Sequence, residues 1–93
     1  MAQLAESKVF EDNDRVRITE WRFAPGTEPG NHVHELDYTV VPLLTGTLMI
    51  VSADGETENN IVYGVPYFRR AGAEHNVVNR SNIAAAFMEI EIK

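Results

Sequence analysis

The stretch GTEPGNHVH, residues 26–34, carries two of the three histidines of the chain, His32 and His34. Its first part is dense in glycine and proline and predicts a loop, while residues 32–44 predict one or two strands. Residues two apart in a strand point to the same face of a sheet. His32 and His34 are therefore expected to lie side by side, as half of a metal site.

The remaining histidine, His75, begins another short predicted strand, residues 75–78. If this strand runs alongside the first, His75 supplies a third ligand. Imidazole nitrogens suit Fe, Zn, Ni, Mn, Co or Cu, so the predicted cofactor is a divalent transition ion whose identity stays open. A His-x-His pair alone is also common without a metal, and a lone histidine is more often structural, so the surrounding pattern has to decide.

The rest of the chain alternates between short strands and turn signals, and no segment shows the 3.6-residue period of a helix. Residues 15–24 predict a strand in which a bulge near Thr19-Glu20 turns Val16, Ile18, Trp21 and Phe23 inward. The last strand alternates from Ala84 to the C-terminus, and its apolar side, with Met88 and Ile90, is expected to face the core. Phe68 is also expected there.

One all-β domain is predicted for residues 1–93, either a sandwich or a closed barrel. Residues 1–8 are expected to form a flexible or dimer-contacting lead-in. A chain of 93 residues gains stability by burying an edge strand against a second copy, which predicts a homodimer.

The spacing around the first two histidines matches a known motif. Gly26, then five residues, then His32-x-His34 and finally Gly46 follow G-x5-H-x-H-x3,4-E-x6-G, the first motif of the cupins. A second motif of the same family reads G-x5-P-x-G-x-x-H-x3-N. It is matched in spacing by Gly64, Arg70, Gly72, His75 and Asn79.

The chain therefore resembles the cupins over more than half of its length. Three runs, residues 19–26, 37–43 and 72–79, are similar to a group of small bacterial cupins, one member of which is associated with β-alanine degradation. The resemblance implies a double-stranded β-helix, also called a jelly-roll barrel, with His32, His34 and His75 around one metal ion. It indicates the fold and the site better than the reaction.

Two departures from the motifs affect the site. The glutamate of the first motif falls on Thr39 or Tyr38, depending on the register, and neither is a carboxylate. A three-histidine site with open positions, as in the three-histidine thiol dioxygenases of this class, is the preferred interpretation. Asp37 as a fourth ligand is the alternative. Without a carboxylate ligand the site is more positive, which favours a carboxylate-bearing substrate.

The second departure is Arg70 in place of the motif's proline. Arg69-Arg70 form either a solvated surface pair, which is the favoured interpretation, or a clamp for a substrate carboxylate. Tyr38 is the nearest candidate for a catalytic group, although packing would equally explain it. No carboxylate or further histidine is clearly placed in the cavity. Glu74 is expected to point away from it, and Asn79 to secure a turn.

Composition narrows the functional classes. With a net charge of −6 the chain would repel phosphate backbones, so no nucleic-acid partner is predicted. The absence of cysteine excludes disulfides and thiolate ligands and is compatible with a cytoplasmic protein. No secretory signal or membrane segment is predicted.

Three functions remain open on these grounds. The first is a metalloenzyme of the dioxygenase or isomerase/lyase type acting on a small organic substrate. The second is a cupin that binds or senses a small molecule without transforming it, and the third is a metal-free barrel kept for assembly.

Overall fold

The structure is a computed structural model that describes residues 3–93, and every regular element in that range is a β-strand. The strands are β1 (Gln3–Leu4), β2 (Glu6–Asp12), β3 (Val16–Phe23), β4 (Thr27–Glu28), β5 (His32–Val33), β6 (Asp37–Pro42), β7 (Gly46–Ser52), β8 (Gly55–Ile61), β9 (Tyr67–Arg69), β10 (Glu74–Val78) and β11 (Ala85–Ile92). The prediction of an all-β chain is confirmed. From residue 3 onward there is no helix that could cross a membrane.

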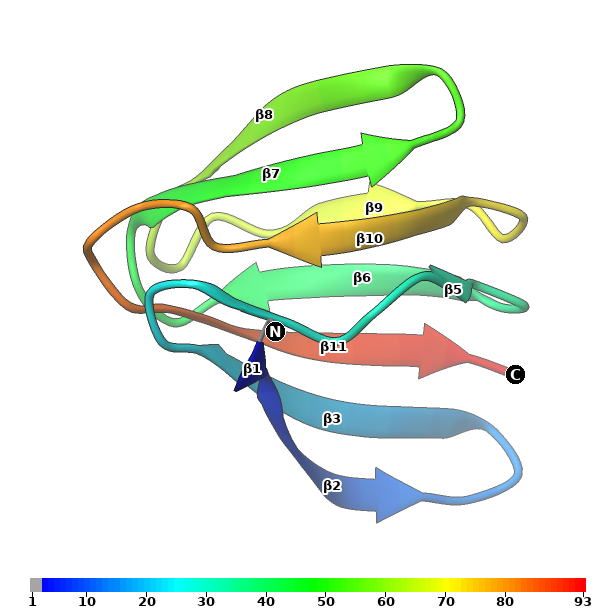
Figure 1. The fold of residues 1–93 in the computed structure, drawn as a ribbon. Helices are drawn as coiled ribbons and strands as arrows, with labels where there is room; N and C mark the ends of the chain where they lie inside the picture. The colour runs from blue at the N-terminus through cyan, green and yellow to red at the C-terminus, as the bar shows by residue number, and fades with distance from the viewer. Residues whose placement is uncertain (1–2) are drawn as a thin grey trace.

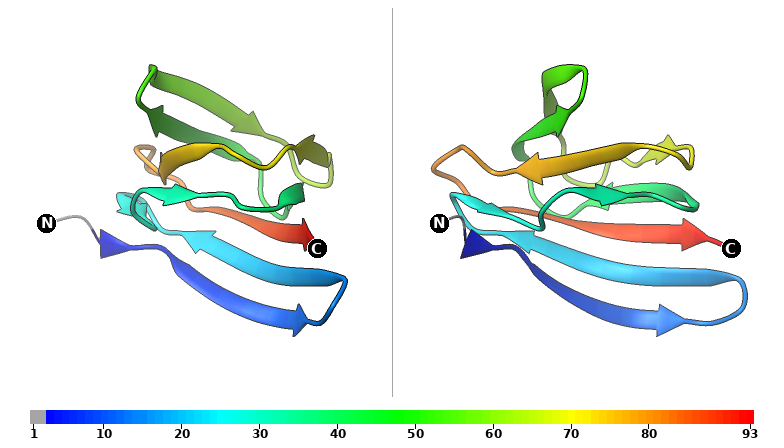
Figure 2. Two further views of the ribbon diagram at one scale, coloured as in Figure 1. Left: turned by 90° about the vertical axis from the view of Figure 1, so that its right-hand side faces the viewer. Right: turned by 45° about the vertical axis from the view of Figure 1, so that its right-hand side comes forward.

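Two sheets form the body of the protein (Figures 1 and 2). The larger sheet has the order β2-β3-β11-β6-β9, and the smaller one has the order β5-β10-β7-β8. A short parallel pair, β1 and β4, lies beside them. Most neighbours in the sheets are distant in sequence, as in the pairing of β11 with β3 and β6. The fold therefore brings strands from both ends of the chain around one interior.

The core lies between the two sheets. Phe23 on β3 and Phe87 on β11 stack with ring centroids 5.6 Å apart, and Leu48 on β7 is 1% exposed. Burying a side chain of this size contributes about 1.5–3 kcal/mol to folding. The other buried apolar residues of the core cluster are Tyr38, Val40, Ile61, Val77 and Ala85.

The orientation of β11 differs from the prediction. Glu89 and Glu91 point into the interior, where they line the cavity together with Phe87. Met88 and Ile90, which were expected to face the core, occupy the alternate positions and therefore point to the outer face of the sheet. The side of a strand that faces inward is set by its register with its neighbours, and here the more apolar side is not the inner one.

The predicted bulge in β3 is also wrong. β3 pairs with β11 in continuous register, and the irregularity lies in β2, between Val9 and Glu11. Without a bulge in β3, Trp21 and Phe23 face inward, but Val16 and Ile18 have the opposite parity and face outward. On β9, Phe68 is 50% exposed and does not join the core either.

Most of the expected lead-in lies in paired strands. β1 pairs with β4, and Glu6, Ser7 and Lys8 of β2 pair with β3. Residues 1 and 2 lie outside the described residues. All seven residues of β2 are exposed at the edge of the larger sheet, and their contact with a second copy stays a prediction.

Two motif residues fix the loops that carry the histidines. Gly72 has a φ of +105°, a left-handed backbone conformation that glycine adopts without strain, and its N–H donates to the carbonyl of His34 at 2.7 Å. Asn79 is fully buried and donates to the carbonyls of Phe23 and Ile83, both at 2.9 Å. Asn79 thus secures a turn, as the sequence predicted.

Candidate metal centre

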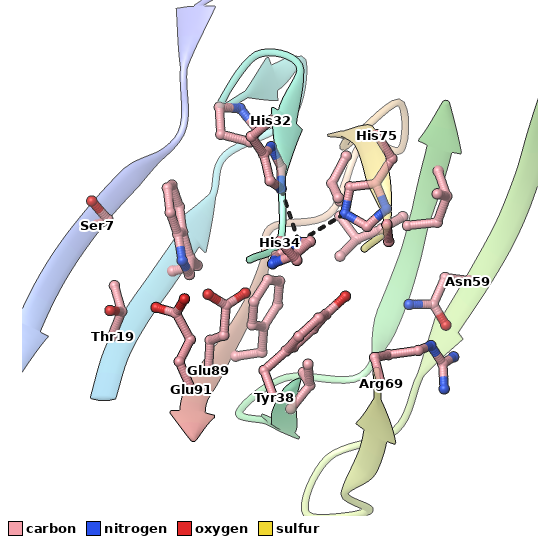
Figure 3. Close-up of a pocket in the computed structure, with 18 of the residues that line it drawn as sticks. Ser7, Thr19, His32, His34, Tyr38, Asn59, Arg69, His75, Glu89 and Glu91 are labelled. Atoms are coloured by element: carbon pink, nitrogen blue, oxygen red, sulfur yellow. Dashed lines mark hydrogen bonds between the residues drawn. The ribbon is translucent and has the colours of Figure 1, made fainter. Parts of the chain in front are cut away.

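The three histidines meet at one point in the structure. β5 pairs with β10 so that His32 lies opposite His75, and His34 follows just after β5. Each ring offers a nitrogen, and these atoms all lie within 4.8 Å of one another. The Nε2 atom of His34 is 3.1 Å from that of His32 and 3.0 Å from that of His75 (Figure 3). The predicted convergence of two distant segments is present.

Backbone contacts hold the rings in this arrangement. Nδ1 of His32 lies 2.9 Å from the carbonyl of Gly30, so this nitrogen donates and Nε2 keeps its lone pair. The N–H of His34 donates to the carbonyl of Ala73 at 2.9 Å, which fastens the loop after β5 to the segment before β10. A fixed tautomer with a free Nε2 is how protein histidines are presented to metal ions.

The electrostatics keep the site in its metal-binding form. Burial, together with the charges of His32 and His75, lowers the pKa of His34 to about 4. Burial and the charge of His32 also lower the pKa of His75. Both rings are therefore neutral at physiological pH and present lone pairs rather than protons, which is the state that a metal requires.

The donor set fits one transition ion. Nitrogens that bind one tetrahedral ion at about 2.0–2.1 Å are about 3.4 Å apart. The two short Nε2 separations, 3.1 and 3.0 Å, are within a few tenths of an ångström of this value, and the third lies within 4.8 Å. Three converging lone pairs repel one another unless a cation or a proton lies between them, so an ion would relieve an otherwise unfavourable contact.

Asp37, the alternative fourth ligand, is not brought to the cluster. It is the exposed first residue of β6, and its Oδ1 accepts a hydrogen bond from the N–H of Ala71 at 2.8 Å. Tyr38 is buried and lines the cavity, so Asp37 on the alternate parity points away.

Tyr38 lies directly against the candidate ligands. Its ring stacks on His34 with centroids 4.2 Å apart and planes at 22°. Burial raises the pKa of Tyr38 to about 12, and the negative charge of Glu89 acts in the same direction. The hydroxyl is therefore protonated at neutral pH, where it is a hydrogen-bond donor and a weak acid. A catalytic role for Tyr38 stays a prediction.

Sequence reasoning missed two carboxylates in the cavity, Glu89 and Glu91 on β11 (Figure 3). Glu91 is 8% exposed and accepts two hydrogen bonds from Arg17 on β3, at 2.7 and 2.9 Å. Glu89 is 9% exposed, and within residues 3–93 its carboxyl has no hydrogen-bond or ion-pair partner. The i, i+2 spacing of these two acids, opposite Arg17 and Thr19 two apart on another strand, is the signal that could have revealed them.

Burial is the main reason that Glu89 is hard to ionise. It raises the pKa of Glu89 to about 7, the charge of Glu91 adds to this, and Arg17 opposes it. A carboxyl with a pKa near neutrality, in a cavity that candidate metal ligands also line, is typical of functional groups.

The remaining predicted residues lie at the periphery. Glu74 is exposed and accepts a hydrogen bond from Asn31 at 3.0 Å, so it points away from the cavity as expected. Arg69 lines the cavity with its guanidinium 4.5 Å from the ring centre of Tyr67, whereas Arg70 is exposed and does not. Both arginines are exposed, as the surface interpretation expects, and only Arg69 could contact a ligand in the cavity. The cavity that these groups surround has a volume of about 770 Å³.

Comparison with known proteins agrees with the fold. No model of a known protein family matches the chain. The β-alanine degradation protein BauB of Pseudomonas aeruginosa is 52% identical over 82 residues, which are 88% of this chain and 86% of that protein.

Solved structures give the same result. A cupin domain from Bordetella pertussis has a TM-score of 0.97 at 46% identity and covers 100% of this chain and 97% of that one. The polyketide cyclase RemF from Streptomyces resistomycificus has a TM-score of 0.76 at 21% identity, over 98% of this chain and 66% of its own. The likeness to RemF bears on the fold alone.

Two facing sheets with three histidines converging between them define a cupin, and the predicted double-stranded β-helix is confirmed. Within the cupins, the chain belongs to the family of small proteins that includes BauB.

Proposed function

We propose that this cupin is a metal-dependent enzyme that acts on a small carboxylate-bearing substrate. The observation that carries the proposal is the cluster of His32, His34 and His75 at the wall of a cavity of about 770 Å³. The three imidazoles would hold one divalent transition ion. When bound, such an ion supplies Lewis-acid chemistry for an isomerase or lyase reaction or, if it is iron, dioxygen chemistry.

The residues of the chain would support this reaction in distinct ways. Tyr38, held against His34, would donate a hydrogen bond from its hydroxyl to a substrate oxygen. Trp21, Phe23 and Phe87 line the cavity with apolar surface, which excludes water from the reacting groups. A substrate carboxylate would be attracted by the ion, because three imidazole ligands leave its charge uncompensated.

The name of the Pseudomonas aeruginosa relative supports the substrate class. That protein is named for the degradation of β-alanine, which is a small carboxylate. A non-catalytic cupin that only binds such a compound is the alternative, and recovery of the ligand unchanged is the result that would favour it.

The proposal is tested first by metal content. Protein prepared without a histidine tag should contain about one transition ion per chain by elemental analysis, and His34→Ala should contain none. Asp37→Asn serves as the control and should keep its metal, because Asp37 lies away from the cluster. Failure to find any ion, with a melting temperature unchanged by added Zn²⁺, Ni²⁺, Co²⁺, Mn²⁺, Cu²⁺ or Fe²⁺, would refute the centre.

Turnover is tested second. Protein loaded with Fe²⁺ should consume oxygen in the presence of one of a set of small amino and thiol acids. For oxygen-independent reactions, mass spectrometry of the same mixtures with each metal should detect a product. The absence of turnover across all metals and substrates would contradict the enzymatic proposal.

A further inference from the structure

Within residues 3–93, the Glu89 carboxyl has no hydrogen-bond or ion-pair partner in the cavity. It is 9% exposed, it lines the cavity, and no arginine, lysine or histidine of residues 3–93 forms an ion pair with it. Its neighbour Glu91 is different, because both carboxylate oxygens of Glu91 are occupied by Arg17. No side-chain oxygen of the described residues is both fully buried and without a partner, so the Glu89 oxygens are open to the cavity. A cationic group of a ligand that fills this space would supply the partner that Glu89 lacks.

Among residues 3–93, the groups around Glu89 include no cation that is free to compensate it. Thr19 lies opposite it on β3, and Val40 lies opposite it on β6. The charged and titratable groups that influence Glu89, or are influenced by it, are Glu91, Arg17, Tyr38 and Tyr67. Of these only Arg17 is a cation, and it is already committed to Glu91.

The direction in which Glu89 points connects it with the metal centre. Figure 3 shows Glu89 and Glu91 reaching from β11 toward the side of the cavity where His34 lies, with Tyr38 beside them. A small molecule held at the histidines would therefore extend into the space that the Glu89 carboxyl faces.

We infer that the ligand of this cavity is a small amino acid, with its carboxylate directed to the metal centre and its ammonium group received by Glu89. The position of the ligand's carboxylate rests on the proposed function, and the binding of its ammonium group by Glu89 is the new part. An ammonium group would provide both the hydrogen-bond donors and the positive charge that Glu89 lacks. Burial raises the pKa of Glu89 when the site has no ligand, and an ammonium group would lower it again.

Calorimetry with two matched probes tests this assignment. Protein loaded with Zn²⁺, which has no redox chemistry, is titrated at pH 8 with 3-aminopropanoate and with propanoate, which differ only in the amine. The amino acid should bind at least about tenfold more tightly, the lower end of the contribution of a hydrogen bond to a charged group. Glu89→Gln should remove this preference, whereas Glu6→Gln, on the exposed strand β2, should keep it.

The pH dependence of the wild-type protein gives an independent readout. The affinity for 3-aminopropanoate should fall about tenfold from pH 8 to pH 6 relative to propanoate, because Glu89 becomes protonated below a pKa of about 7. Equal affinity for the two probes would overturn the amine assignment alone. Absence of binding by both probes, despite bound Zn²⁺, would overturn the carboxylate proposal as well.

Discussion

Replacement of Glu89 by glutamine should stabilise the metal-free protein in a pH-dependent manner. The pKa of Glu89 rises from 4.5 to about 7 on folding because of burial. Below pH 4.5 the carboxyl is protonated in both the folded and the unfolded chain and has no effect on stability. Between pH 4.5 and 7 the folded chain retains a proton that the unfolded chain loses, so the free energy of unfolding falls as pH rises.

The size of this loss follows from the shift. A difference of 2.5 pKa units at 1.36 kcal/mol each corresponds to about 3 kcal/mol, reached above pH 7. Glutamine has nearly the shape of the protonated carboxyl but does not ionise. Glu89→Gln should therefore gain stability relative to the wild type as pH rises. The difference between their free energies of unfolding should be about 3 kcal/mol larger at pH 8 than at pH 4.5.

Urea denaturation in the presence of a chelator, at half-unit steps from pH 4.5 to 8.5, measures this difference. Other titrating groups, including His34 with its lowered pKa, are present in both proteins and cancel in the comparison. Glu6→Gln, at an exposed position, controls for the loss of one negative charge. A stability difference that does not change with pH would refute the burial of an ionisable carboxyl at this position.

Further predictions concern the ion pair, the core and the oligomeric state. Arg17→Met should lower the free energy of unfolding by about 2 kcal/mol, which is less than for a fully buried pair because Arg17 is 40% exposed. The double variant Arg17→Met/Glu91→Gln should recover part of this loss, and additive losses would contradict the pairing. Leu48→Ala, at a core position that is 1% exposed, should lower the free energy of unfolding by about 3 kcal/mol. Leu44→Ala, at a position that is 40% exposed, should lower it by less than about 1 kcal/mol. Equal effects would argue against the packing described for β7. Light scattering should give twice the 10.4 kDa mass of the chain, and a monomer mass at micromolar concentration would contradict the predicted homodimer.

The histidine cluster shows how far local pattern reaches. His32 and His34 were expected on one face from their spacing, and the resemblance to the second cupin motif implied that His75 would join them. The first expectation depends on short-range geometry, namely the alternation of side chains along an extended chain. The structure adds the pairing of β5 with β10 that places the rings within 4.8 Å.

The carboxylates of β11 show where local pattern stops. Met88 and Ile90 alternate with Glu89 and Glu91, and hydrophobicity alone favours the apolar pair as the inner side. The structure reverses this, because the register of β11 between β3 and β6 places Glu91 beside Arg17 and Tyr38. A shift of one residue in this register would exchange the two faces.

The amino-acid sequence by itself determined the all-β fold, the three candidate ligands and the turns that carry them, because each depends on spacing along the chain. Only the tertiary structure decided which face of β11 and of β3 points inward, and with it the presence of an unpaired carboxyl in the cavity. The reason is physical: a strand has two faces of equal geometry, and the choice between them is made by pairing with strands that are distant in sequence.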